Sequence, residues 1–190
     1  MKKILMAVAV LGAFAAAPAS AQWYIGGGVG SAQAKMGSFS PAAGVSVSGS
    51  SNRDTSWKLL GGYQFTPNWG LEAQYGALGR FKYDVTQAGA TSSSSFRAQQ
   101  WSLAGTGTLP LSNNFYLMGK LGFSANKVSS STFMTGGNKT DLLAGAGVGY
   151  DFNKNWGVRF EYENFGKLST IQNGSSVKGD NWALSAKYSF

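Results

Sequence analysis

The chain has no cysteine and no histidine, and each absence removes a class of function. Without cysteine the protein can form no disulfide, use no thiol nucleophile and build no Cys-ligated metal site. Without histidine it lacks the commonest metal ligand and the commonest general base. We therefore expect no metal site, no cofactor and no enzyme activity.

Charged residues are also scarce, at 13% of the 190 residues, whereas glycine occurs 27 times. This composition is poor in helix formers and unusual for a water-soluble surface. The 16 basic residues outnumber the 8 acidic ones, giving a net charge of +8. The basic residues form no dense run, and an exported chain has no obvious access to nucleic acid, so nucleic acid is not an expected partner.

The N-terminus, "MKKILMAVAVLGAFAAAPASAQ", has the layout of a cleavable secretory signal. Lys2 and Lys3 precede an apolar run and then the small residues of an A-x-A site. The run is shorter than the roughly 20 residues that a helix needs to span a bilayer. We predict a signal peptide over residues 1–21, cleaved between Ala21 and Gln22. The mature chain, 22–190, suits a single domain.

Beyond the signal, alternation with a period of two predicts β-strands throughout. Eight strands are expected, at 22–33, 55–65, 69–79, 96–110, 115–126, 140–152, 156–166 and 179–190. Three connections are short turns, at 66–68, 112–114 and 153–155. The other four are long and polar, at 34–54, 80–95, 127–139 and 167–178. In an up-and-down meander every short turn falls at one end of the sheet and every long loop at the other.

The stretch "NWGVRFEYENFG" (155–166) shows two opposed faces, because Val158, Phe160 and Tyr162 alternate with charged residues. A soluble lipocalin-type barrel would turn the apolar face inward. The other face, however, is too lean in charge for a soluble exterior. All six tryptophans share the apolar parity, and we expect two aromatic girdles: Trp23, Trp69 and Trp156 at the short-turn end, and Trp57, Trp101 and Trp182 at the other. The sequence predicts an all-β, eight-stranded, antiparallel, up-and-down transmembrane β-barrel, closed because hydrocarbon leaves no partner for an open edge.

The face opposite the tryptophans would then line the lumen. We predict a lumenal charge network of Lys58, Lys120, Arg159 and Lys187 with Glu72, Asp151, Glu161 and Glu163. Four positive charges balance four negative ones, which leaves little net buried charge. Eight strands enclose an interior that side chains just fill, and inward glycines would leave room for the larger charged groups. A related hairpin pattern occurs earlier, since "NWGLEAQYGALG" (68–79) echoes 155–166.

Three segments resemble the transmembrane domain of the outer-membrane protein A (OmpA) family and its small OmpX-type relatives: "GGYQFTPNWGLEAQYGALGR", "GVGYDFNKNWGVRFEYE" and "WALSAKYSF". The resemblance implies an integral protein of the Gram-negative outer membrane. It implies that Tyr188 and Phe190 form the terminal signature recognised by the barrel-assembly machinery. Glu72 and Arg159 match the lumenal gate of the family, with Thr106 and Gly149 where its further Lys and Glu partners stand. The family's peptidoglycan-binding domain, and with it a tether to the cell wall, is expected to be absent.

The leading hypothesis is a non-enzymatic barrel that supports envelope integrity. A basic extracellular rim would contact lipopolysaccharide phosphates: Arg80, Lys82, Arg97, Lys127, Lys139, Lys167 and Lys178. The expected partners are outer-membrane lipids, lipopolysaccharide and the assembly machinery, and the protein is expected to be a monomer.

Three alternatives stay open. The lumen could form a narrow pore for ions or small solutes. The Ser-rich loops could act as an adhesin, with Phe133 and Met134 as apolar anchors. A serine hydrolase of the Ser-His-acid type is excluded, but an inward lysine, Lys120 or Lys187, could in principle serve a Ser-Lys pair.

Overall fold

A computed structural model describes residues 22–35, 39–42, 45–51, 53–87, 90–128, 137–170 and 176–190. The predicted signal peptide, including Ala21, lies outside these residues, as do Phe133 and Met134. The described strands are β1 (Gln22–Lys35), β2 (Phe39–Ala42), β3 (Val45–Ser51), β4 (Arg53–Gln64), β5 (Trp69–Gln87), β6 (Ala90–Pro110), β7 (Phe115–Val128), β8 (Gly137–Asp151), β9 (Trp156–Thr170) and β10 (Ser176–Ser189). Within the described ranges we find no helix long and apolar enough to cross a membrane.

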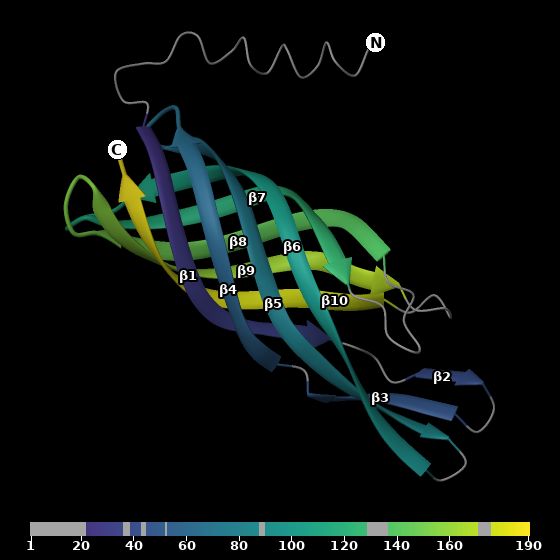
Figure 1. The fold of residues 1–190 in the computed structure, drawn as a ribbon. Helices are drawn as coiled ribbons and strands as arrows, with labels where there is room; N and C mark the ends of the chain where they lie inside the picture. The colour runs from purple at the N-terminus through teal and green to yellow at the C-terminus, as the bar shows by residue number, and fades with distance from the viewer. Residues whose placement is uncertain are drawn as a thin grey trace, which may run out of the picture.

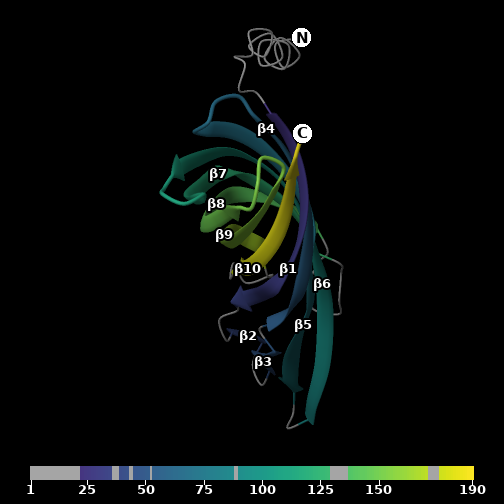
Figure 2. The same ribbon diagram turned by 90° about the vertical axis from the view of Figure 1, so that its left-hand side faces the viewer.

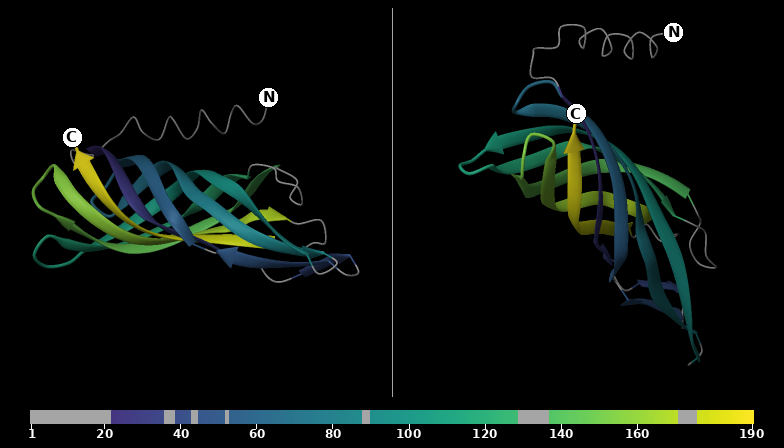
Figure 3. Two further views of the ribbon diagram at one scale, coloured as in Figure 1. Left: turned by 60° about the horizontal axis from the view of Figure 1, so that its bottom comes forward. Right: turned by 60° about the vertical axis from the view of Figure 1, so that its left-hand side comes forward.

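Eight of these strands close into a ring in the order β1-β4-β5-β6-β7-β8-β9-β10, and every neighbouring pair is antiparallel (Figure 1). The seam joins β1 to β10, and its short-turn end is held by the last residue of the chain. The Phe190 N–H donates to the Trp23 carbonyl at 3.0 Å, and the Gln22 side chain donates to the Phe190 carbonyl at 2.9 Å. The end of β10 therefore lies beside the start of β1 (Figure 3). The predicted eight-stranded up-and-down barrel is confirmed.

Short turns at one end of the barrel match local turn chemistry. Asn153 accepts hydrogen bonds from the Asn155 and Trp156 backbone N–H groups at 2.9 Å, and Thr66 accepts one from the Trp69 N–H at 2.9 Å. The third turn uses positive φ at Asn113 and Asn114 (58° and 63°), a conformation that asparagine tolerates. These side chains fix the three turns at the positions that the sequence predicts.

At the other end the strands continue well past their predicted limits, so the described parts of the segments predicted as long polar loops are strands instead. Residues 80–95 belong mostly to β5 and β6, which form one extended hairpin. Residues 34–54, predicted as a loop, contain β2 and β3, and β3 pairs along β5 with Val47 opposite Val85. The extension projects beyond the other strands (Figure 2). Sequence alternation missed it because Ser- and Thr-rich segments such as 91–95 carry no apolar period, although such residues pair readily in strands.

Two bands of aromatic side chains encircle the outer surface. At the short-turn end, Trp23 contacts Tyr63 and Trp156 contacts Tyr188, with ring centroids 4.8 and 5.0 Å apart. At the other end, Tyr75 bridges Trp57 and Trp101 at 5.6 and 4.5 Å, and Tyr162 contacts Trp182 at 4.8 Å. All six tryptophans are 44–65% exposed. Trp57, Trp101 and Trp182 lie inside β4, β6 and β10, which extend beyond the girdle.

Beyond this outer girdle the barrel reverses its polarity. An outer apolar cluster fills the interior there, every member at most 2% exposed: Leu78, Phe81, Val128, Leu143, Phe165, Leu168 and Val177. Arg80, Lys127 and Lys167 point outward from the same strand extensions and are exposed. Between the girdles the outside is apolar, whereas past the outer girdle the inside is, as in a water-soluble barrel. Phe81, Val128, Leu168 and Val177 lie in segments predicted as loops, so this apolar interior was not predicted.

Two glycine sites mark the start of this reversed region. Gly79 in β5 and Gly166 in β9 have φ of 91° and 66°, and each is followed by a residue whose N–H is bound by an aspartate on the neighbouring strand. Asp54 accepts from the Arg80 N–H at 2.5 Å, and Asp141 accepts from the Lys167 N–H at 2.8 Å. Backbone N–H groups of Lys167 and Leu142 lower the pKa of Asp141 below its usual 3.8. Both aspartates and both glycines are 87 residues apart, so the hairpin echo in the sequence corresponds to two equivalent clamps on opposite walls.

Replacing Gly166 with alanine tests whether this clamp supports the outer region. A Cβ at residue 166 would lie 2.7 Å from the Asp141 Cγ and would have to adopt a φ that alanine disfavours. We expect Gly166→Ala to lower the free energy of unfolding by about 1–3 kcal/mol, measured by urea unfolding in lipid vesicles. Gly105→Ala is the control, because its nearest neighbour, the Leu121 carbonyl, lies 3.8 Å away. Equal losses in the two variants would contradict a special role for the clamp.

Candidate functional site

The lumen between the girdles contains a cluster of six buried charges centred on Lys120. The Lys120 Nζ lies 2.8 Å from Glu72 Oε1, 2.8 Å from Glu161 Oε1 and 2.9 Å from Glu163 Oε1. All four side chains are at most 2% exposed. One ammonium therefore neutralises part of three carboxylates that β5 and β9 bring together from different walls.

Lys58 and Arg159 supply the two further positive charges. Lys58 contacts Glu161 and Glu163 at 2.7 and 3.0 Å, and the Arg159 Nη1 contacts Glu72 Oε2 at 2.8 Å. The Tyr24 hydroxyl also donates to Glu72, at 3.0 Å. Three cations and three anions leave no net charge in the cluster, which is the condition under which buried ions are tolerated. Because β4, β5, β7 and β9 all contribute, the cluster cross-links the barrel through its centre.

Glycines of β8 provide the space for these long side chains. A Cβ at Gly145 would lie 2.9 Å from Lys120 Cγ, and one at Gly147 would lie 3.0 Å from Glu161 Cγ. Thr106 and Gly149 were expected to stand where the lumenal gate of the OmpA family has its further lysine and glutamate. Thr106 lines a cavity at the short-turn end of the cluster, and Gly149 packs against the Tyr116 ring. The lysine and glutamates of the cluster are instead Lys120 on β7 and Glu161 and Glu163 on β9.

The other two predicted network members, Lys187 and Asp151, form a separate pair. Their side chains are 3.1 Å apart and 14% and 39% exposed. The Lys187 ammonium also lies over the Tyr116 ring, 5.2 Å from its centroid. The eight residues therefore form a buried group of six and a more accessible group of two rather than one network.

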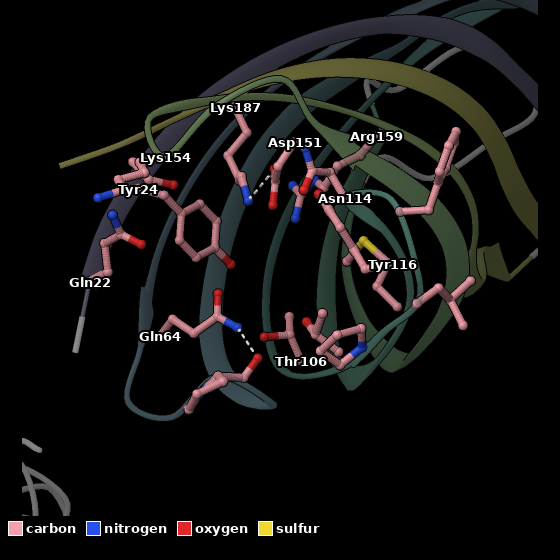
Figure 4. A pocket seen from close by; sticks show the side chains of 17 residues that line it. Gln22, Tyr24, Gln64, Thr106, Asn114, Tyr116, Asp151, Lys154, Arg159 and Lys187 are labelled. Carbon is pink, nitrogen blue, oxygen red and sulfur yellow. Dashed lines mark hydrogen bonds and ion pairs between the residues drawn. The ribbon is translucent and has the colours of Figure 1, made fainter. Parts of the chain in front are cut away.

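Lys187 and Asp151 border a cavity of about 580 Å³ that opens at the short-turn end (Figure 4). Tyr24, Gln64, Thr106 and Tyr116 line it, and Arg159 forms part of its floor. The cavity ends at the charge cluster.

Above the charge cluster, neutral polar residues and then the outer apolar cluster continue the filling of the lumen. The Ser56 hydroxyl bonds Asn181 at 2.6 Å, and Ser124 and Asn126 donate to the Phe165 carbonyl at 3.0 and 3.2 Å. The described interior is thus blocked at two levels of different chemistry, first by ions and then by packed aliphatic and aromatic side chains. A solute would have to displace both.

The arrangement offers little catalytic chemistry. Lys120, the inward lysine considered for a Ser-Lys pair, is held by three carboxylates that favour its charged form, so it cannot serve as a general base. Across the residues that the structure describes, no group of three or more potential acidic ligands is arranged to hold a metal ion.

The predicted rim residues all lie on strands; Arg97 is in a segment predicted as strand, whereas the other six are in segments predicted as loops. Arg80 and Lys82 belong to β5, and Arg97, Lys127, Lys139, Lys167 and Lys178 to β6, β7, β8, β9 and β10. Five are exposed and Lys139 is half-buried, while for Lys82 only the backbone position is described. Arg80 lies directly opposite Arg97 across the β5–β6 ladder, and Lys167 opposite Lys178 across β9–β10. Sequence spacing gave no sign of these like-charged pairs, because they depend on strand register.

The predicted assembly residues lie at the short-turn end of β10. The Tyr188 ring contacts Trp156 and Phe190, with centroids 5.0 and 5.2 Å apart. Phe190 directly follows β10, is 65% exposed and adds to the aromatic girdle at the short-turn end.

Removing Lys120 tests the importance of the charge cluster. Lys120→Met leaves three buried carboxylates short of a cation, so we expect a loss of about 3–5 kcal/mol in unfolding free energy. Lys187→Met, which breaks the more exposed pair, should cost about 1 kcal/mol or less. Tryptophan fluorescence during guanidinium unfolding would measure both. Adding Glu163→Gln to Lys120→Met should restore part of the loss, and no restoration would argue against charge as its cause.

Comparison with known proteins agrees with this geometry. The profile of the family described as "Outer membrane protein beta-barrel domain" matches residues 5–190. Outer membrane protein A of Serratia marcescens is 30% identical over 211 residues, covering 100% of this chain and 56% of that protein, so the chain spans about half the length of this relative. OprG of Pseudomonas aeruginosa has a similar fold, with a TM-score of 0.66 and 14% identity over 89% of this chain and 95% of that one. Ail of Yersinia pestis, solved with the heparin analogue sucrose octasulfate, has a TM-score of 0.53 and 19% identity over 90% and 99% of the two chains.

The family match spans the whole described barrel, and the solved outer-membrane proteins share its fold. The chain belongs to the outer membrane protein β-barrel domain family, as an OmpA-like barrel of the Gram-negative outer membrane.

Proposed function

We propose that this protein is a non-enzymatic outer-membrane barrel that supports envelope integrity, with its basic rim contacting the phosphates of lipopolysaccharide. The observation that carries this proposal is the set of exposed cations directly beyond the outer girdle: Arg80, Arg97, Lys127, Lys167 and Lys178. Arg97 precedes Trp101 by four residues along β6. At about 3.3 Å per residue and a tilt of about 40°, it stands roughly 10 Å above that tryptophan, at headgroup height.

Three acidic residues of the same region, Asp54, Asp141 and Asp180, have partners within the barrel wall. Asp54 and Asp141 bind backbone N–H groups, and Asp180 is 4% exposed and bound by Lys35. Asp54 and Asp141 keep their negative charge, but the five exposed cations outnumber them, and Asp180 is already paired with Lys35. A rim with this excess of cations attracts anionic headgroups, and the attraction falls off within a Debye length.

The solved relative Ail supports the same kind of chemistry, since its complex contains an oligosulfated sugar. For this chain we extend the proposal to four further features. Tyr188 and Phe190 would be read by the assembly machinery. Residues 1–21 would be removed as a signal peptide. The barrel would act as a monomer, and residues 22–190 would form its single domain.

A narrow pore is the second candidate, because the 580 Å³ cavity gives access to the lumen from the short-turn end. The charge cluster and the outer apolar cluster both stand between this cavity and the opposite end. We therefore favour a closed scaffold.

Lipopolysaccharide binding can be tested with the refolded protein in phosphatidylcholine nanodiscs. We expect phosphorylated lipopolysaccharide to bind about 10-fold more tightly than its dephosphorylated form, with the preference shrinking as salt rises. Replacing the five exposed rim cations with glutamine should abolish the preference. Lys154→Gln, in a turn at the opposite end, is the control and should change nothing. Equal binding of the two lipid forms by the wild type would refute the proposal.

Single-channel conductance in a planar bilayer separates the scaffold from the pore. We expect the wild type to be silent, and Arg159→Ala to be silent too, because the outer apolar cluster remains in place. Discrete steps in the wild type would favour the pore. Steps in Arg159→Ala alone would mean that the charge cluster is the sole barrier.

A further inference from the structure

The cavity at the short-turn end has the size and the position of a binding pocket. Its volume is about 580 Å³, and it ends at Arg159 (Figure 4). Pockets of 300 to 1,000 Å³ are typical of small-molecule sites. The short turns of outer-membrane barrels face the periplasm, so periplasmic solutes can enter the cavity. The charge cluster lies beyond Arg159, so a solute that enters from this side stays on it.

Arg159 at the end of the cavity has hydrogen-bond donors that the described residues do not satisfy. Its Nη1 donates to Glu72 at 2.8 Å, whereas its Nε and Nη2 are buried without a hydrogen-bond partner in the described part of the chain. Nη2 lies 3.8 Å from Glu161 Oε2, which is too long for a hydrogen bond. Nε and Nη2 form one edge of the guanidinium, and two parallel donors of this kind bind both oxygens of a carboxylate. Buried donors without acceptors cost free energy, which a carboxylate arriving through the cavity would recover.

Aromatic and aliphatic side chains line the space in front of Arg159. Tyr24 on β1 and Tyr116 on β7 are buried on opposite walls of the barrel, and Met118 lies two residues further along β7. Each ring faces a cation, since Arg159 Cζ lies 5.7 Å from the Tyr24 centroid and Lys187 Nζ lies 5.2 Å from the Tyr116 centroid. Apolar walls with a cationic end suit an organic anion, because a small inorganic anion would lose its hydration without gaining apolar contacts.

The charges around the cavity favour a ligand with one negative charge. Lys187 pairs with Asp151 at 3.1 Å, and Arg159 belongs to the neutral charge cluster. Lys154, in the turn between β8 and β9, also lines the cavity and is exposed, and no described residue forms an ion pair with it. The surplus is therefore about one positive charge, which a monoanion balances and a dianion exceeds.

We propose that this cavity binds small organic monocarboxylates from the periplasm. The carboxylate binds the Nε–Nη2 edge of Arg159, and the apolar part of the ligand lies between Tyr24 and Tyr116. Arg159 is 3% exposed, so its guanidinium turns slightly toward the cavity to receive the ligand. Lys154 at the mouth attracts the anion. The site goes beyond the proposed lipopolysaccharide contact and is independent of it, because it lies at the other end of the barrel.

Benzoate is the probe for this site, and benzamide, which has the same shape without the charge, is the control ligand. The protein is refolded into phosphatidylcholine nanodiscs, and the arginine Nε–H resonances are followed by NMR as each ligand is added. We expect benzoate to shift one resonance, which is missing from the spectrum of Arg159→Lys, and to bind about 10-fold or more tightly than benzamide. Equal affinities for the two ligands would overturn the inference, as would inorganic phosphate binding as tightly as benzoate.

Two tryptophan substitutions on β6 test whether benzoate binds in the cavity. Thr108 lines the cavity and bonds Asn68 through its backbone alone, so Thr108→Trp fills the cavity and leaves every charge in place. It should weaken benzoate binding about 10-fold or more. Leu109→Trp adds a tryptophan at the neighbouring residue, which is 58% exposed on the outer wall, and should leave the affinity unchanged. Gel mobility without heating checks the folded fraction of each variant.

Arg159→Lys separates the planar donor edge from simple charge. The ammonium keeps the positive charge and cannot bind both carboxylate oxygens in parallel, so this variant should also lose about 10-fold or more in affinity for benzoate. Full affinity in Arg159→Lys would overturn the role of the guanidinium edge. Full affinity in Thr108→Trp would mean that benzoate binds elsewhere, for example at the basic rim, and would overturn the site itself.

Discussion

The structure depends on one constraint, which is that no backbone N–H or C=O group may face hydrocarbon without a partner. Closure of β1 on β10 meets this constraint and fixes eight strands around a narrow interior. An interior of fixed width must then be filled, and long charged side chains can fill it only where glycines face them. Closure limits the space inside the barrel, and Gly145 and Gly147 leave room for Lys120 and Glu161 opposite them. The cluster around Lys120 is in turn acceptable only because its charges cancel.

Each long strand passes through two surroundings, lipid between the girdles and water past the outer girdle. Between the girdles the surroundings are apolar and the inside carries the charges, and past the outer girdle water surrounds the strands and the inside is apolar. The positive-φ residues Gly79 and Gly166, with Asp54 and Asp141 binding the next N–H group, lie at the change. The strands do not exchange faces to achieve this: in β7, Val128 continues the inward row of Lys120 and Ser124 without a register shift, so the change lies in which residue types occupy the two faces.

Much of this architecture could be predicted from residue order. The alternation from Trp156 to Glu163 indicated which side chains face lipid and which face the lumen, and the asparagine-rich turns indicated which end is compact. Ion pairs such as Lys58 with Glu161 could not be predicted, because they join opposite walls and depend on the stagger of the strands around the ring. The outer apolar cluster was missed because Leu78 and Phe165 are isolated inward residues in sequence and form a core only when the walls meet. The opposed Arg80 and Arg97 were hidden for the same reason, since register across the bulge at Gly79 brings them together.

The outer apolar cluster gives the two parts of the barrel different thermal behaviour. Apolar side chains between the girdles face lipid rather than water, so withdrawal from water contributes little to the stability of that part of the barrel within the bilayer. Phe81, Phe165 and Leu168 are withdrawn from water, and their contribution therefore carries the heat-capacity change that accompanies hydrophobic burial. Cooling weakens such a contribution. The hydrophobic stabilisation of the region past the outer girdle should therefore depend more steeply on temperature than that of the belt between the girdles.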